Sequence, residues 1–168
     1  MDDLNLAFSG AGFLGIYHIG VVSCLKFYGQ KLLDKIECVG GSSAGALTAC
    51  MLICDMDLEA SVQFVMHLAS KVHGQILGPL SPEFEPCEKI RKTYMTHLPA
   101  DAYKRVSGKL FISLTRVSDF ENVVVSDFSS NKELVDVSFL NIKLDIMLQI
   151  NFSKIISRLL NFLMHFQK

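Results

Sequence analysis

One local pattern occurs twice near the N-terminus: a short apolar run, a glycine-rich turn and an apolar helical segment. The first turn covers residues 9–15, SGAGFLG, and the second covers residues 39–45, VGGSSAG. The apolar runs 4–8 and 36–39 precede these two turns. Strand, helix, strand and helix in succession predict a parallel sheet with right-handed crossovers. The chain is therefore expected to belong to the α/β class.

The spacing of apolar residues predicts the other elements. Helices are expected over residues 16–28, 44–56, 58–72 and 87–97, with one more from about residue 132 that residues 129–131 would cap. Strands are expected over residues 110–115 and 122–126, joined by a hairpin connection at 117–119. Prolines mark residues 78–83 as a loop.

Composition narrows the functional classes. The chain has 168 residues, half of them apolar, and a net charge of −1. This composition suits one folded domain and argues against a disordered chain. The absence of a basic excess argues against nucleic acid as a partner. Five cysteines without a C-x-x-C pair indicate buried free thiols in a reducing compartment and no zinc site. Neither a metal nor a cofactor is expected.

The two ends of the chain bear on localisation. Residues 1–3 are acidic where a secretory signal would be basic, and no apolar run reaches the roughly 18 residues that span a bilayer. A cytoplasmic or membrane-surface protein is expected, without a signal peptide or a transmembrane helix. Residues 138–168 form a divergent tail, with a strand pattern over 140–150 and an amphipathic helix from Phe152 to Phe166. That helix either packs on the core or lies on an anionic lipid surface.

The first turn has the G-x-G-x-x-G spacing of a dinucleotide-binding loop, through Gly10, Gly12 and Gly15. Such a site also needs an acidic residue at the end of the second strand to hold the ribose. Glu37 stands near the start of that strand, and glycines occupy its end. A nucleotide site is therefore the less favoured interpretation of this turn.

The second turn fits G-x-S-x-G and centres on Ser43, between a predicted strand and a predicted helix. This is the setting of a nucleophile elbow, in which a sharp turn exposes the serine hydroxyl above the sheet. The amide of the next residue, Ala44, can donate to an oxyanion. The motif comprises Gly41, Ser42, Ser43, Ala44 and Gly45. The alternative is a turn of small residues without chemistry.

The two turns together favour acyl chemistry. Adjacent parallel strands present their C-terminal ends on one edge of the sheet, so the first turn should lie beside Ser43. The main-chain amides of Gly10, Ala11 and Gly12 can then face a developing oxyanion, where each donor stabilises the transition state by about 3 kcal/mol. The expected oxyanion loop comprises Gly10, Ala11, Gly12, Phe13, Leu14 and Gly15.

These motifs and their flanks resemble the patatin-like phospholipase family, most closely its adipose triglyceride lipase branch. The match is carried by FSGAGFLGIYHIGVVSCL, GGSSAGALTA, ILGPLSPEF and LTRVSDFENVVVSDFSS, within residues 4–137. The resemblance implies a three-layer α/β/α fold with a mainly parallel sheet, and hydrolysis of neutral-lipid or phospholipid esters by a Ser/Asp dyad. It also implies a lipid-droplet or membrane surface and a protein coactivator as partners. Leu14 stands where many patatins carry arginine, as is usual in this branch.

The dyad acid of the family lies in an Asp-Gly-Gly or Asp-Gly-Ala motif, and this sequence contains no Asp-Gly dipeptide. Residues 4–137 are therefore expected to be a partial, C-terminally truncated domain. Asp119 and Asp127 are interpreted as turn acids, Asp145 as an exposed strand residue and His18 as a packing histidine. His67, His73, His97 and His165 have no motif context. No residue is assigned as the base.

Three hypotheses follow. The chain is a lipid acyl hydrolase that forms an acyl-enzyme on Ser43, by resemblance. Alternatively it is a catalytically inactive lipid-surface or regulatory protein that lacks the dyad acid. The third hypothesis is a non-functional truncated product.

Overall fold

A computed structural model describes residues 4–73, 86–116 and 118–139 of the chain. Within them, one sheet contains the strands β1 (Leu4–Phe8), β2 (Ile36–Gly41), β3 (Leu110–Thr115) and β4 (Asn122–Val125). The helical segments are η1 (Gly12–Leu14), α1 (Gly15–Tyr28), α2 (Gln30–Leu33), α3 (Ala44–Ile53), α4 (Leu58–His73), α5 (Pro86–His97), α6 (Ala102–Val106) and a helix over residues 131–139.

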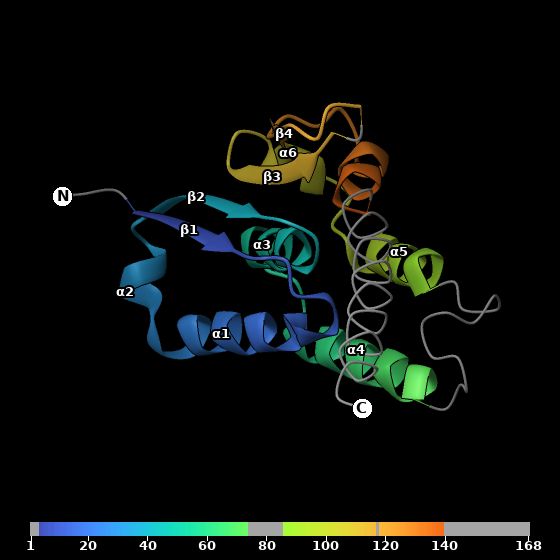
Figure 1. Cartoon of the computed structure of the whole chain (residues 1–168). Coiled ribbons are helices and arrows are strands. Elements are labelled where there is room, and N and C mark those ends of the chain that lie inside the picture. The colour runs from blue at the N-terminus through green and yellow to red at the C-terminus, as the bar shows by residue number, and fades with distance from the viewer. Residues whose placement is uncertain (1–3, 74–85, 117, 140–168) are drawn as a thin grey trace, which may run out of the picture.

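The strands follow one another in the sheet in sequence order (Figure 1). β1 pairs with β2 and β2 with β3 in parallel, whereas β3 and β4 form an antiparallel hairpin. The α/β class and the mainly parallel sheet predicted from the sequence are thus confirmed. Phe8 at the end of β1 pairs with Gly41 at the end of β2, so the turns that follow both strands leave the same edge of the sheet.

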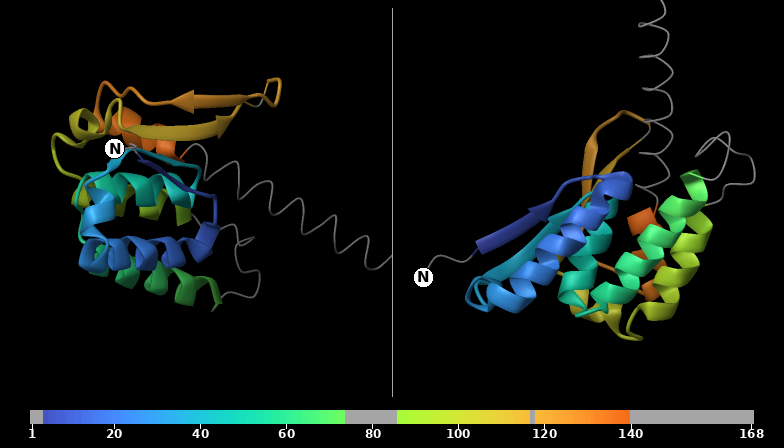
Figure 2. Two further views of the ribbon diagram at one scale, coloured as in Figure 1. Left: turned by 90° about the vertical axis from the view of Figure 1, so that its left-hand side faces the viewer. Right: turned by 90° about the horizontal axis from the view of Figure 1, so that it is seen from below.

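One face of the sheet forms the core with α3. Val39, Leu110 and Ile112 point to that face and are buried, and α3 contacts β1, β2 and β3. Below α3 lies α1, with α4 beside it, so the helices stack away from the sheet (Figure 2). On the opposite face, Phe111 and Val124 are exposed. The helix that starts at Ala44 is therefore packed between the sheet and α1, which fixes its N-terminal end.

Element boundaries differ from expectation at two points around the second turn. β2 extends through Gly40 and Gly41, because their backbones complete the pairing with β1 and β3. α3 ends at Ile53 rather than at Met56, because Asp55 has a positive φ of 52° and cannot continue the helix. The short helices α2 and α6 were not expected. The predicted loop 78–83 and the predicted tail elements lie outside the described residues.

The predicted cap of the helix at residues 131–139 is confirmed. The hydroxyl of Ser130 accepts a hydrogen bond from the amide of Glu133 at 3.2 Å, and the amide of Ser129 donates to the Glu133 carboxylate at 2.8 Å. This arrangement resembles a capping box, except that the Glu133 carboxylate accepts from the residue before the cap. The Asn131 side chain turns instead to α6, where its oxygen accepts from the amide of Tyr103 at 2.9 Å.

The cysteines correct one expectation. Cys50 and Cys54 are buried as free thiols, but Cys24 is exposed and Cys38 is half-buried. Cys24 is exposed because it lies on the side of α1 that faces away from α3, whereas Ile19 and Val22 are buried. Among the described residues, no helix has both the length and the apolar character needed to cross a bilayer.

Candidate active site

The pairing of β1 with β2 brings the two glycine-rich turns into direct contact. The amide of Ser42 donates to the carbonyl of Phe8 at 3.3 Å, so the second turn is tied to the end of β1. Within that turn, the amide of Gly45 donates to the carbonyl of Ser42 at 2.9 Å, and that of Ala46 to Ser43 at 3.0 Å. The turn therefore passes from strand to helix without an intervening loop.

Two glycines make this contact possible. A Cβ atom at Gly45 would lie 2.5 Å from the carbonyl oxygen of Ser9 and would also overlap the carbonyl of Phe8. A Cβ atom at Gly41 would lie 2.5 Å from the carbonyl carbon of Gly45. Real Cβ atoms do not approach backbone atoms this closely. The outer glycines of the G-x-S-x-G motif are thus required by backbone-to-backbone packing, independently of any chemistry.

The first turn also packs against the second turn at the point where α1 begins. A Cβ atom at Gly15 would lie 2.9 Å from the Cβ atom of Ala44, the residue after Ser43. Gly12 has a positive φ of 52°, and the amide of Leu14 donates to the carbonyl of Ala11 at 2.9 Å. By contrast, the amides of Gly10, Ala11 and Gly12 donate to no backbone acceptor in the part of the chain that the structure describes. These amides are available to a ligand.

Ser43 occupies the sharpest point of the second turn. Its φ of 53° and ψ of −126° are strained for a residue with a Cβ atom, a strain that typically costs about 1–3 kcal/mol. The expectation that the turn exposes the serine is not met, because Ser43 is only 2% exposed. Its hydroxyl makes no hydrogen bond with any described residue, although buried polar groups normally have a partner.

The N-terminal end of α3 lies at Ser43 and can stabilise a negative charge there. The helix begins at Ala44, whose amide has no acceptor among the described residues. The aligned peptide dipoles place partial positive charge at this end, which favours an anion. Further along α3, the hydroxyl of Tyr94 donates to the carbonyl of Leu47 at 3.0 Å and anchors the helix to α5. Burial, together with the nearby Cys50 thiol, raises the pKa of Tyr94 well above its ordinary value, so Tyr94 stays a neutral donor.

His18 has a contact that sequence reasoning missed. Its Nε2 atom lies 3.0 Å from the carbonyl oxygen of Ser9, to which it donates, and its ring packs against Phe8 at 5.4 Å between centroids. The histidine therefore ties the first turn of α1 to the start of the glycine-rich turn. Its place just after that turn was the available signal, but the partner is a backbone carbonyl, which a sequence motif does not reveal.

The candidate acids are not brought to Ser43 by any contact of the described residues. Asp119 accepts from the Arg116 guanidinium at 2.8 Å, and this pairing lowers the pKa of its carboxyl. Asp127 is exposed beyond the end of β4. His97 lies 2.8 Å from the carbonyl of Thr93 on its own helix. Asp145 and His165 lie outside the described residues, and the side chains of His67 and His73 are not described. A search of the described residues also finds no group of three side chains that could hold a metal ion.

A comparison with models of protein families shows to which family the chain belongs. The model of the patatin-like phospholipase family matches residues 6–138, which include both glycine-rich turns. The chain belongs to the patatin-like phospholipase family. The resemblance stated from the sequence motifs is thereby confirmed.

Individual relatives from the patatin-like phospholipase family agree. The chain is 44% identical over 134 residues to patatin-like phospholipase domain-containing protein 2 of Rattus norvegicus, which covers 80% of this chain and 28% of the relative. It is 41% identical over 132 residues to 1-acylglycerol-3-phosphate O-acyltransferase PNPLA3 of Homo sapiens, which covers 79% and 27%. The chain thus spans less than a third of the length of either relative. A solved structure of the type III effector protein ExoU superposes at a TM-score of 0.49 and 19% identity, over 83% of this chain and 40% of that one.

Proposed function

We propose that this chain carries out lipid acyl chemistry in which Ser43 is the nucleophile and the two glycine-rich turns supply the oxyanion donors. The observation that carries the proposal is the strained backbone of Ser43 just before α3, in a turn whose Gly45 lies directly against the end of β1. Free amides at Gly10, Ala11, Gly12 and Ala44 support it. Membership of a phospholipase family with an acyltransferase among its relatives points to lipid esters as substrates.

The first step of the proposed reaction is attack on an ester carbonyl. The Oγ atom of Ser43 forms a bond to the carbonyl carbon, and the carbonyl oxygen becomes an oxyanion that the free amides stabilise. Collapse of this intermediate breaks the ester C–O bond, so that the alcohol leaves with the proton that came from Ser43 and the acyl group stays on Ser43. Water then yields a fatty acid, or an acceptor alcohol yields a new ester. The lipid would come from a droplet or membrane surface, with a protein coactivator as a further partner.

The serine proton must pass to a general base, and this requirement supports a second candidate function. No carboxylate or imidazole among the described residues hydrogen-bonds the Ser43 hydroxyl. Removing the base from such a unit typically slows the reaction by several orders of magnitude. A chain that keeps the elbow without a base would be a catalytically inactive lipid-surface or regulatory protein.

A fluorophosphonate probe tests the proposal, because it reacts with an activated serine and remains attached. We expect a single phosphonyl adduct on the peptide that contains Ser43, detected by mass spectrometry. Ser43→Ala should abolish the adduct, whereas the neighbouring substitution Ser42→Ala should retain it. Product analysis with diacylglycerol and a monoacyl acceptor then separates hydrolysis from acyl transfer.

Two outcomes would count against the proposal. A chain that melts cooperatively but carries no adduct on Ser43 would favour the inactive lipid-surface protein. A chain without a cooperative melting transition would favour the non-functional product instead.

A further inference from the structure

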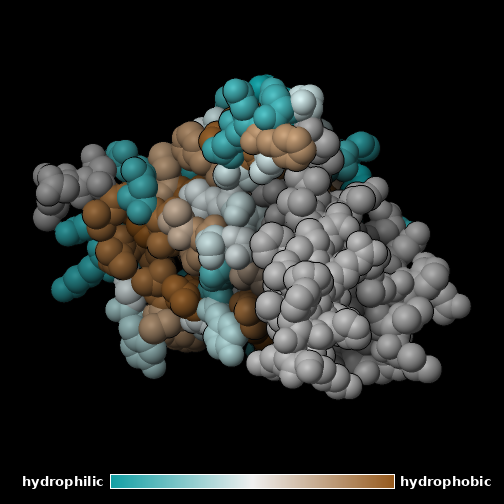
Figure 3. Space-filling model, in the orientation of Figure 1, coloured by the Kyte–Doolittle hydropathy of each residue, from teal (hydrophilic) through white to brown (hydrophobic). Residues whose placement is uncertain are grey.

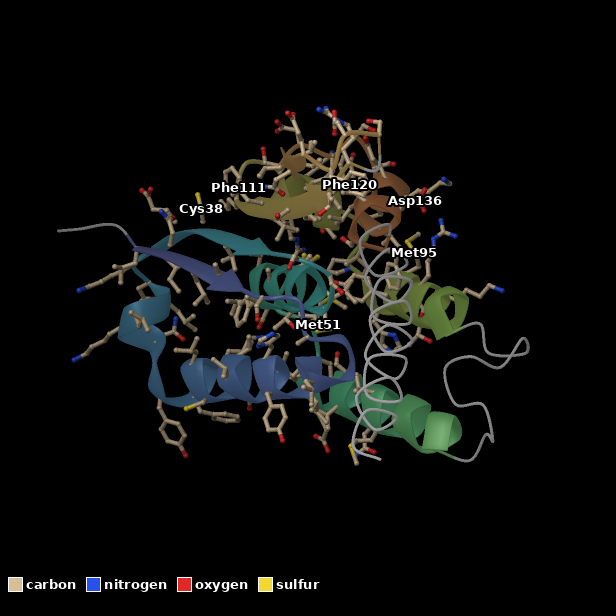
Figure 4. The ribbon with its side chains drawn as sticks, in the orientation of Figure 1. Cys38, Met51, Met95, Phe111, Phe120 and Asp136 are labelled. Carbon is tan, nitrogen blue, oxygen red and sulfur yellow. The ribbon has the colours of Figure 1, made fainter. Side chains whose placement is uncertain are left out.

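The last turn of α3 carries two buried thiols that the proposed acyl chemistry does not use. Cys50 and Cys54 are one helical turn apart, and their Sγ atoms lie 4.0 Å from each other. Both are free cysteines, with exposures of 0% and 3%. Their neighbour Met51 lies on a different side of the helix, between α3 and α1 (Figure 4). The two sulfur atoms are therefore in direct contact inside the protein.

Polar groups from α5 and α6 surround this pair of thiols. The Tyr94 hydroxyl of α5 lies beside the Cys50 thiol and donates to the carbonyl of Leu47 at 3.0 Å. On α6, Arg105 is close enough for its charge to act on Cys54. The pair thus lies where α3 meets α5 and α6, with a hydroxyl group at one thiol and a positive charge near the other.

These surroundings make the two thiols unequal. The hydrogen bond with Cys50, together with the charge of Arg105, lowers the pKa of the Cys54 thiol below its ordinary value. The hydrogen bond with Cys54, together with burial, raises the pKa of the Cys50 thiol well above its ordinary value. The thiolate is the nucleophile in cysteine chemistry, and cysteines that only fill apolar space have raised pKa values and are inert. Cys54 is therefore the more reactive member of the pair.

Cys54 also lies at the end of α3, where the backbone opens most easily. The helix ends in a Schellman motif, in which the amide of Met56 donates to Met51 at 3.0 Å and that of Asp55 to Leu52 at 3.3 Å. Asp55 is exposed and has a positive φ of 52°, a conformation that favours glycine. This terminal turn therefore opens at a lower cost than the helix interior, and its opening admits small solutes to Cys54.

A disulfide between the two positions requires the terminal turn to tighten. Cβ atoms four residues apart on a helix are separated by about 5–6 Å, whereas a disulfide holds them at about 3.5–4.5 Å. In the middle of a helix, the turns on both sides would resist this change. Cys54 is the C-cap residue of α3, so no further helical turn follows it. The terminal turn can therefore tighten without breaking the helix that precedes it.

We propose that Cys50 and Cys54 form a dithiol that hydrogen peroxide closes reversibly to a disulfide. The Cys54 sulfur attacks one peroxide oxygen, the O–O bond breaks, and hydroxide leaves and takes up a proton as water, so that Cys54 becomes a sulfenic acid. The Cys50 sulfur then bonds to the Cys54 sulfur, the S–O bond breaks, and the Cys50 proton leaves with the hydroxyl group as a second water. Two electrons pass from the sulfur atoms to the peroxide. Exchange with an external thiol restores both cysteines.

Mass spectrometry of the full chain tests the proposal. The folded protein is treated with hydrogen peroxide, quenched in acid, unfolded and alkylated, and trypsin then releases residues 36–71 as one peptide. We expect this peptide to lose two hydrogen atoms and two sites of alkylation, and fragmentation should place the bond between Cys50 and Cys54. Dithiothreitol should restore both sites. Cys38→Ser, in the same peptide, should leave the bond unchanged, because Cys38 lies on the face of the sheet that is turned away from α3 (Figure 4).

Two variants test the order of attack. In the Cys50→Ala protein, the sulfenic acid on Cys54 has no thiol to react with, so dimedone should capture it there. In the Cys54→Ala protein, Cys50 should remain a free thiol under the same conditions. Circular dichroism confirms the fold of each variant. Equal capture by dimedone at Cys50 and at Cys54 would show that the assigned roles are wrong.

The inference is overturned if the folded chain keeps both thiols while Cys24 is oxidised. Cys24 is exposed on α1, which forms part of the surface visible in Figure 3, so it would react first if exposure alone decided reactivity. The inference is also overturned if the bond forms only in urea, or if non-reducing electrophoresis shows that it joins two copies of the chain. None of these outcomes depends on the labelling of Ser43, so failure here is distinct from failure of the proposed function.

Discussion

The elbow around Ser43 and the β3–β4 hairpin both turn the chain sharply, but different forces hold them. At the elbow, Gly41 and Gly45 bring backbone against backbone with no room for a side chain. The hairpin turn is held by ion pairs from Arg116 to Asp119 and Glu121, all at the surface. The elbow is buried, whereas Phe120 in the hairpin turn is 78% exposed. Substitutions should therefore change stability much more at the elbow than in the hairpin turn.

The largest expected change in stability tests the close backbone packing at the elbow. Gly45→Ala places a Cβ atom against the carbonyls of Phe8 and Ser9, so we expect a loss of at least about 3 kcal/mol in the free energy of unfolding. Gly20→Ala is the matched control on α1, where a Cβ atom meets nothing, and helix propensity should stabilise it by up to about 1 kcal/mol. Denaturant titration measures both. Equal stability of the two variants would show that the turns do not touch.

A second prediction compares backbone strain in the two turns. Ser43 and Phe120 both have positive φ, at 53° and 61°. Substitution by glycine relieves such strain, so Ser43→Gly and Phe120→Gly should each raise the unfolding free energy by up to about 1 kcal/mol. Only Ser43→Gly should also lose fluorophosphonate labelling. A destabilising effect of Ser43→Gly, measured by denaturant titration, would contradict the strained elbow.

A third prediction concerns the hydrogen bond between His18 and the glycine-rich turn. His18→Phe keeps a ring against Phe8 but removes the hydrogen bond to the carbonyl of Ser9. A hydrogen bond of this kind contributes about 1 kcal/mol to stability, so its loss should lower the melting temperature by about 2–4 °C. The labelling rate at Ser43 should fall by up to about fivefold, because the glycine-rich turn is held less firmly. His97→Phe, whose histidine bonds only within α5, is the control and should leave the rate unchanged.

The smallest effect is expected in the hairpin. Arg116 holds the pKa of Asp119 below its ordinary value of 3.8, so the folded state favours the charged carboxylate. This contribution is present above the unfolded pKa and is lost as the pH falls through the lower folded value. Asp119→Asn should therefore lower the melting temperature slightly at neutral pH, and the difference should vanish in strong acid. Unchanged labelling of Ser43 is also expected, and a large loss would identify Asp119 as the missing base.

The sequence was sufficient to predict the elements around the two turns. Apolar runs at 4–8 and 36–39 have the composition of buried strands, and the glycines between strand and helix mark the turns. Their adjacency also followed from a general rule, because neighbouring parallel strands end at the same edge. The observed pairing of Phe8 with Gly41 has this arrangement.

Other features depend on contacts between distant segments, which local patterns do not encode. The burial of Ser43, which its local motif did not predict, is one of these features. The bond between His18 and Ser9 joins a side chain to a main-chain carbonyl, and any residue could supply that carbonyl. The exposure of the outer side of α1 was not predicted, because an apolar helix is normally expected to be buried.

The structure of the phosphonylated protein would test the central claim most directly. If the two turns enclose one site, the phosphonyl oxygen on Ser43 should lie within about 3.2 Å of the amide nitrogen of Ala44 and of at least one amide from Gly10 to Gly12. An adduct whose oxygen points to solvent, with all of these amides out of hydrogen-bonding reach, would contradict the account.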